Sequence, residues 1–168
     1  EDIVEALTIP HRYDVQFSLN NITGFPEETR ELALDTIELN RQIDFDNANI
    51  YSFVPFHGTP LRKLCEKQGL ISKDTIARAL TDRPMLEMPQ YPVEEIEGIK
   101  KCFILYVKFP KSRWGEIRKA EANTTEGNRM FKALKEEFME KYFSQPKDNQ
   151  HAQFPGTADL EYGISSLS

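Results

Sequence analysis

The chain has 168 residues, of which 39% are hydrophobic and 11% aromatic, which suits about one globular domain with its own core. Its 27 acidic and 21 basic residues give a formal net charge of -6, and this excludes a phosphate-binding surface that covers the whole chain. The sequence contains no apolar run near the roughly 18 residues that span a bilayer, and no secretion signal. We therefore expect a cytoplasmic protein with no membrane partner and no clear nucleic-acid surface.

The first predicted elements are a strand and a helix. In the segment 13–23, apolar and polar residues alternate with the period of two that is typical of a strand, and the strand is expected to end at Asn20. A helix over about 27–42 follows, because Pro26 suits a first helical position and two acidic residues suit the positive end of the helix dipole.

A second strand and a second helix come next. The segment 49–56 is short, apolar and rich in aromatic residues, which predicts a strand. Thr59 suits the N-cap of the following helix, with Pro60 behind it and Gly69 as its stop. Because the connections are only a few residues long, this order indicates a βαβ unit with parallel strands and a right-handed crossover.

The remainder of the chain is predicted to be helical. Apolar residues recur at helical spacing over 96–107, which predicts a helix of about 15 residues that ends before Pro110, and again over 131–142. Both apolar stripes are interpreted as core or docking faces. From Ser144 onward the chain is polar and is expected to form an irregular tail.

The two cysteines, Cys65 and Cys102, lie far apart in apolar helical segments, and neither belongs to a Cys-x-x-Cys or Cys/His cluster. They are interpreted as buried free thiols, and no metal ligand is predicted in this chain.

The stretches NNITGFPE (20–27) and VPFHGT (54–59) directly follow the two predicted strands. Ligands of parallel sheets bind at the C-terminal ends of the strands, so both stretches should lie on one rim. Small and polar residues in the first stretch are consistent with a ligand that meets the chain there. The alternative is a turn that merely needs its glycine and proline.

Together, ITGFPEET (22–29), DTIELNRQI (35–43) and FVPFHGTPLRKLCEKQGLI (53–71) resemble the C-terminal half of a radical S-adenosylmethionine (SAM) barrel. The resemblance is nearest to the subgroup with an upstream cobalamin-binding domain. Such enzymes commonly show a GxPxET turn after the fifth strand, and a PxxGTxL turn with a helix ending in KxGL after the sixth. Both patterns occur here in that order, within about Tyr13 to Ile71.

The resemblance implies an α/β fold in which residues 1–72 form the C-terminal part of a TIM-type partial (β/α) barrel. Residues 73–143 would be a helical extension and 144–168 the irregular tail. The family's GxIxGxxE pattern aligns with residues 20–27 and matches Ile22, Gly24 and Glu27, but has Asn20 where the family often has glycine. The implied cofactor-binding residues are these four together with the apolar wall formed by Phe53, Val54 and Pro55.

The implied cofactors are SAM, a [4Fe-4S] cluster and, for the named subgroup, cobalamin. The cluster would need a CxxxCxxC loop, which the sequence does not contain. The chain is therefore expected to be a fragment or one piece of a split gene, inactive alone, whose partner is the missing N-terminal part of the same enzyme. The resemblance implies reductive SAM cleavage and radical chemistry, methyl transfer or another reaction, on an unknown substrate.

Two other functions were weighed. A non-catalytic interaction or scaffold module on a truncated barrel is suggested by the apolar stripes at 96–107 and 131–142. A hydrolytic enzyme is disfavoured because the sequence has no GxSxG motif. No catalytic residue is predicted: His57 is interpreted as a solvated loop histidine, and Glu28 and Arg62 as surface or packing residues.

Overall fold

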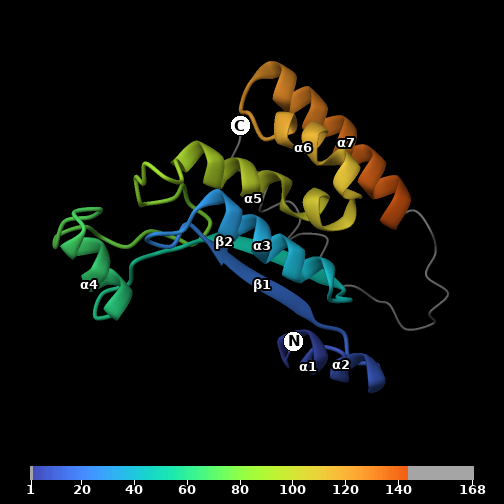
Figure 1. Cartoon of the computed structure of the whole chain (residues 1–168), viewed down its shortest axis with the longest axis horizontal. Helices are drawn as coiled ribbons and strands as arrows, with labels where there is room; N and C mark the ends of the chain where they lie inside the picture. Colours follow the sequence, from blue (N-terminus) through green and yellow to red (C-terminus); the bar gives the residue numbers. More distant parts are fainter. Residues whose placement is uncertain (1, 144–168) are drawn as a thin grey trace.

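The structure is a computed structural model that describes residues 2–143. The first half of the chain contains helices α1 (Asp2–Ala6) and α2 (Ile9–Arg12), strand β1 (Ser18–Thr23), helix α3 (Arg30–Arg41), strand β2 (Asn47–Ser52) and helix α4 (Pro60–Lys67). After a long connection come α5 (Val93–Lys108), η1 (Lys111–Arg113), α6 (Trp114–Ala120) and α7 (Thr125–Phe143) (Figure 1).

The two strands pair in parallel, from Ser18 opposite Asn47 to Thr23 opposite Ser52, with α3 as the crossover. This confirms the predicted βαβ order and a mixed α/β fold. Two strands are present in the part of the chain that the structure describes, so a TIM-type barrel stays a prediction. The irregular tail lies outside the described residues.

The ends of the first strand and the start of the first long helix were predicted wrongly. Strand β1 does not end at Asn20 but continues to Thr23, because residues 20–23 pair in register with β2. Helix α3 begins at Arg30, since Thr29 is its N-cap and accepts a hydrogen bond from the Leu32 N–H. Pro26 therefore lies in a turn and not in the helix.

The second strand ends four residues earlier than predicted, although Phe53 N–H still donates to Thr23 O at 2.8 Å. Pro55 then interrupts the pairing because it has no N–H. The signals around α4 are confirmed: Thr59 caps the helix, Pro60 is its first residue, and Gly69 follows the last turn with a φ of +72°.

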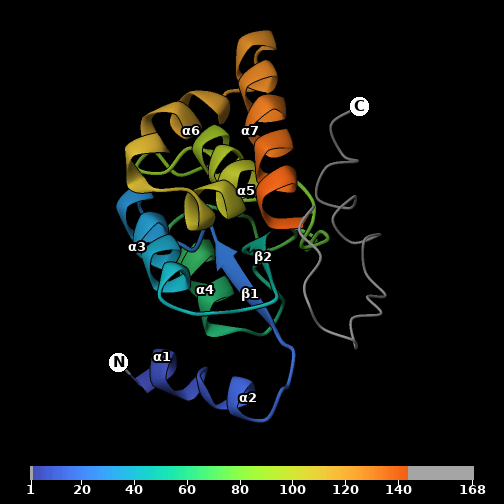
Figure 2. The same cartoon turned by 90° about the vertical axis from the view of Figure 1, so that its right-hand side faces the viewer.

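Helix α5 lies between the βαβ unit and the helix pair α6–α7 (Figures 1 and 2). It packs on α3 and β2, and its apolar stripe is buried. Leu134 and Phe138 of α7, which packs on α6 and α5, are also buried. Both long helices were predicted, whereas α6 was not. Residues of the predicted extension thus share one core with the βαβ unit, and the domain boundary at residue 72 stays a prediction.

One face of β1 is left open. Ser18, Asn20 and Ile22 alternate with residues that face inward, and all three are exposed, Ile22 with 42% of its surface accessible. Within residues 2–143, no helix is long and apolar enough to cross a membrane.

Candidate functional site

The C-terminal ends of β1 and β2 form one rim. The last strand pair is Thr23 and Ser52, and the Phe53-to-Thr23 hydrogen bond carries the ladder one residue further. The rings of Phe25 and Phe53 then meet with centroids 4.9 Å apart. The first turn is therefore in direct contact with Phe53, the residue directly before the second turn.

Gly24 makes the first turn after β1. Its φ is +87°, in the left-handed region that favours glycine, and a Cβ at this position would lie 3.4 Å from Ile96 Cδ1 of α5. The glycine thus allows both the turn and the close approach of α5 beneath it.

The other predicted site residues divide by exposure. Asn20 and Ile22 lie on the open face of β1, where Asn20 Oδ1 accepts a hydrogen bond from Asn49 Nδ2 at 3.1 Å and Ile22 is opposite Tyr51. By contrast, the predicted apolar wall is buried within the chain itself; it consists of Phe53, Val54 and Pro55. Ligand contact by each of these residues stays a prediction.

Glu27 points away from the turn. It is exposed, has a φ of +69°, and its Oε1 accepts a hydrogen bond from Gln68 Nε2 of α4 at 2.6 Å. Beside it lies an open depression of about 410 Å³ that is lined by Glu27, Gln68, Leu70 and Gln90. Glu27 is therefore available at the outer side of the rim and does not hold the turn.

The residue that holds the turn is Glu28, which sequence reasoning placed among surface or packing residues. Its buried carboxylate accepts hydrogen bonds from the N–H groups of Gly24 and Phe25 and from the Thr23 hydroxyl. Burial raises the pKa of Glu28, and the three donors oppose that rise. The GxPxET pattern contains this glutamate and was the available signal.

Arg62 is likewise buried and organises the second turn. Its guanidinium donates to the carbonyl oxygens of Pro55, Lys73 and Thr75 at 2.9–3.0 Å, and to Glu66 Oε1 at 2.8 Å. The packing interpretation of Arg62 is confirmed and the surface interpretation is wrong. His57 is exposed in the same turn.

The described residues do not fit an iron-sulfur cluster. Among residues 2–143, no group of three or more His, Cys, Asp or Glu side chains is placed to hold a metal ion. Cys65 and Cys102 are buried free thiols, as predicted, on α4 and α5. Burial raises the pKa of both thiols, that of Cys102 to about 12, which disfavours the thiolate that binds iron. Cluster ligands would have to come from outside this part of the chain.

The open face of β1 carries an exposed apolar side chain beside a pair of carboxamides. The exposed Ile22 offers an apolar surface, and the neighbouring Asn20 and Asn49 offer hydrogen-bonding carboxamides on the same face. This combination of apolar contact and directed polar groups is typical of small-molecule sites.

No protein-family model matches the chain, and no solved structure does. Curated proteins do match. The chain is 36% identical over 66 residues to the tRNA-2-methylthio-N(6)-dimethylallyladenosine synthase of Halalkalibacterium halodurans. The matched residues make up 39% of this chain and 12% of the synthase. The synthase of the same name from Geobacillus thermodenitrificans is 30% identical over 88 residues, or 50% of this chain and 17% of the relative.

An uncharacterized methyltransferase of Pyrococcus horikoshii is 25% identical over 109 residues, which is 64% of this chain and 24% of that protein. The chain thus spans about a quarter or less of the relatives it matches. The matched synthases are radical SAM enzymes, so the resemblance to that superfamily is supported at low identity over part of the chain. The resemblance to the cobalamin-associated subgroup stays a prediction.

Proposed function

We propose that this chain forms part of the SAM-binding rim of a radical SAM enzyme. The observation that carries the proposal is the pairing of two adjacent parallel strands, because each strand is followed by one of the motifs that resemble the superfamily and both motifs therefore lie on one rim. The similarity to the methylthio synthases supports the same function independently of the geometry.

In this function the residues of the chain would bind SAM and orient it. Ile22 would contact the purine of SAM and Asn20 would hydrogen-bond at its edge, while the Gly24 turn would hold the end of β1 against α5. Bound SAM supplies the radical chemistry, while the protein positions it and excludes water. Because the cluster does not fit the described residues, the remainder of the barrel, with the CxxxCxxC loop, would be the partner that provides it. Use of cobalamin rests on the sequence resemblance alone.

The alternative function, an interaction or scaffold module, is less well supported, because most of the apolar side chains that suggested it are buried, although Tyr142 is exposed. The apolar stripes at 96–107 and 131–142 were its motive, and the first of them is buried against α3 and β2. In the second, Leu134 and Phe138 are also buried. These buried side chains belong to the core of the chain itself and are not available to a partner, which favours the enzyme over the interaction module.

Titration of SAM into the full-length polypeptide that carries this segment tests the proposal. Ile22→Glu places a charge on the open face of β1 and should weaken SAM affinity at least tenfold. Ile76→Glu is the matched control, because Ile76 is 79% exposed in a loop and should tolerate the change. Equal affinity of the two variants and the parent, with both variants folded, would contradict the proposal.

Two relatives act on tRNA by name, which makes tRNA the first substrate class to test. Under reducing conditions, the reconstituted full-length enzyme should release 5′-deoxyadenosine, and addition of tRNA should increase the release. An increase with a small molecule but none with tRNA would exclude tRNA and leave the SAM-binding rim intact.

A further inference from the structure

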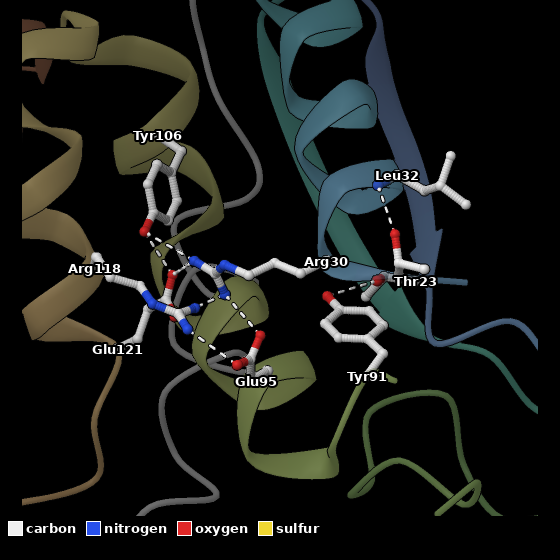
Figure 3. A network of polar contacts seen from close by, with 9 residues as sticks. Thr23, Arg30, Leu32, Tyr91, Glu95, Tyr106, Arg118 and Glu121 are labelled. Atoms are coloured by element: carbon white, nitrogen blue, oxygen red, sulfur yellow. Dashed lines mark hydrogen bonds and ion pairs between the residues drawn. The ribbon is translucent and has the colours of Figure 1, made fainter. Parts of the chain in front are cut away.

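The first residue of α3 is fixed by residues that lie far along the chain. Arg30 NH1 and NH2 donate to the two carboxylate oxygens of Glu121, at 3.0 and 2.6 Å (Figure 3). Arg30 follows the N-cap Thr29 directly, so this bidentate pair ties the end of the rim turn to the C-terminal end of α6.

Glu121 is the centre of a closed network. It also accepts hydrogen bonds from the Tyr106 hydroxyl at 2.5 Å and from Arg118 at 2.9 Å. Arg118 bonds in turn to Glu95 at 3.0 Å, and Glu95 lies 3.6 Å from Arg30. Two guanidinium groups thus face two carboxylates, and the Glu121 side chain is only 6% exposed. Loss of Glu121 would leave the largely buried Arg30 with only the weaker ion pair to Glu95 at 3.6 Å.

The fold makes room for this carboxylate. Gly98 of α5 faces Glu121 so closely that a Cβ at position 98 would lie 2.7 Å from Glu121 Cβ. A side chain at Gly98 would therefore displace Glu121 from its partners, and the glycine is required by packing rather than by backbone conformation.

The other end of the turn is fixed from the same side. The buried Tyr91 hydroxyl, in the segment just before α5, lies 3.3 Å from Thr23 Oγ1 (Figure 3). Thr23 donates in turn to Glu28, which holds the N–H groups of Gly24 and Phe25. Ile96 of α5 packs beneath Gly24 between these two attachments.

We propose that Glu121 and Tyr91 are positioning residues of the rim, so that the α5–α6 segment sets the geometry of the Gly24 turn. They act through Arg30 and Thr23 and do not touch a ligand themselves. The inference rests on the proposed function, because it makes SAM affinity depend on two residues outside the motifs that resemble the superfamily.

The chain offers a matched control. Arg113 and Glu137 form the same bidentate pair, with two bonds of 3.0 Å, but Glu137 is 46% exposed and Arg113 lies on η1, away from the rim turn. Glu137→Gln therefore removes the same charge and the same kind of ion pair as Glu121→Gln without touching the turn.

The experiment compares Glu121→Gln, Tyr91→Phe and Glu137→Gln by amide exchange and by SAM titration of the full-length polypeptide. In Glu121→Gln, exchange at Gly24 and Phe25 should accelerate at least fivefold relative to amides in the middle of α4, and SAM affinity should fall at least fivefold. Tyr91→Phe should also accelerate rim exchange and weaken SAM affinity, each at least twofold. Glu137→Gln should change neither rim exchange nor SAM affinity. A purely structural role would accelerate exchange in α4 equally.

Equal acceleration at the rim and in α4, or unchanged SAM affinity in a variant whose rim exchange has accelerated, would overturn the inference. Should Glu121→Gln fail to fold, Tyr91→Phe decides alone, because it removes one oxygen and keeps the packed ring. If the parent binds no SAM, the proposed function fails, and the exchange ratio still shows whether the α5–α6 segment sets the turn.

Discussion

Adjacent residues at the rim have opposite roles. Glu27 is exposed and reaches toward α4, whereas Glu28 is buried and binds the backbone of the turn. The difference arises because the chain turns through a positive φ at Glu27, which directs the next side chain inward. Three donors around Glu28 compensate part of the cost of burying a carboxylate, although burial still raises its pKa.

Titration of Glu28 should be visible in the stability of the chain. Its pKa is raised by burial, so the folded state binds this proton more tightly than the unfolded state. The corresponding stability is fully present below the ordinary pKa of 4.5 and is lost as the pH rises through the higher folded value. Relative to Glu28→Gln, which does not titrate, the parent should lose unfolding free energy across that window. Urea unfolding at several pH values measures it, and parallel pH profiles would contradict it.

Replacement of Gly24 by valine tests the other requirement of the turn. A β-branched residue resists positive φ and would also press on Ile96, so we expect a loss of about 1–3 kcal/mol in unfolding free energy. SAM affinity of the full-length polypeptide, measured by calorimetric titration, should be impaired more than folding. Gly69→Val is the control, because Gly69 has a similar φ of +72° with no atom within 4 Å of its Cβ position. Unchanged SAM affinity in Gly24→Val would leave Gly24 a purely structural role.

At the scale of elements, β1 and α3 are joined by a reciprocal amide pair. Asn21 Nδ2 donates to Asn40 Oδ1 at 3.1 Å, and Asn40 Nδ2 donates to Asn21 Oδ1 at 2.8 Å. Asn40 is buried, so this pair fixes how α3 lies across the sheet and thereby where its N-terminus meets the rim.

A double-mutant cycle should reveal this coupling. Asn40→Leu removes both hydrogen bonds between Asn21 and Asn40, leaves Asn21 only the bond from its Nδ2 to the Asn49 carbonyl oxygen, and should cost about 1–3 kcal/mol. The double variant with Asn21→Leu should cost less than the sum of the single changes. The pair formed by Asn20 and Asn49 on the open face serves as the comparison, since water can replace it there. Urea unfolding gives all the values, and strict additivity at Asn21 and Asn40 would disprove the coupling.

Elements with strong local signals could be predicted, and the contacts between them could not. The apolar period of α5 and the N-cap at Thr59 can be recognised from neighbouring residues in the sequence. Helix α6 has only seven residues, which are too few to show a helical period. The end of β1 was misplaced because asparagine is unfavourable in strands, yet Asn21 is held by Asn40 from another element. Glu28 and Arg62 were undervalued for a different reason: their hydrogen-bond partners lie nearby in the sequence, but residue type alone does not show that a glutamate or an arginine is buried.

At the scale of the whole molecule, the open face of the sheet and the edge of β1 are the main departures from a self-sufficient domain. Parallel sheets normally have both faces covered, and here the face with Asn20 and Ile22 is exposed. In a barrel the same face would point inward, which is where a ligand would lie.

We therefore expect the isolated chain to self-associate or to be partly molten. Each Å² of apolar surface left in water lacks about 25 cal/mol of stabilising free energy that burial would give, while the entropic cost of ordering the chain is unchanged. Size-exclusion chromatography with light scattering should show oligomers that decrease in Ile22→Lys but not in Ile76→Lys, a control on an exposed loop. A monodisperse parent with strongly protected amides in both strands would show instead that the chain is stable by itself.

The isolated chain is also expected to take up no stoichiometric iron-sulfur cluster. Its two thiols are buried on different helices, and burial disfavours their thiolate forms. Anaerobic reconstitution with iron and sulfide, followed by visible absorption, checks this. A stable brown species with four irons per chain would be incompatible with the arrangement of Cys65 and Cys102.

The single tryptophan of the sequence gives the molecule a natural optical reporter. Trp114 meets the Tyr106 ring edge-on at 5.2 Å, and its indole N–H donates to the Tyr106 carbonyl oxygen. Its fluorescence therefore reports the contact of α5 with α6, together with Arg41 of α3, whose guanidinium lies 5.8 Å from the centre of the indole ring. Far-UV circular dichroism reports all elements together, so coincident transitions would mean that helices and sheet unfold as one cooperative unit. An earlier loss of tryptophan signal would mean that the contact around Trp114 opens before most of the helices unfold.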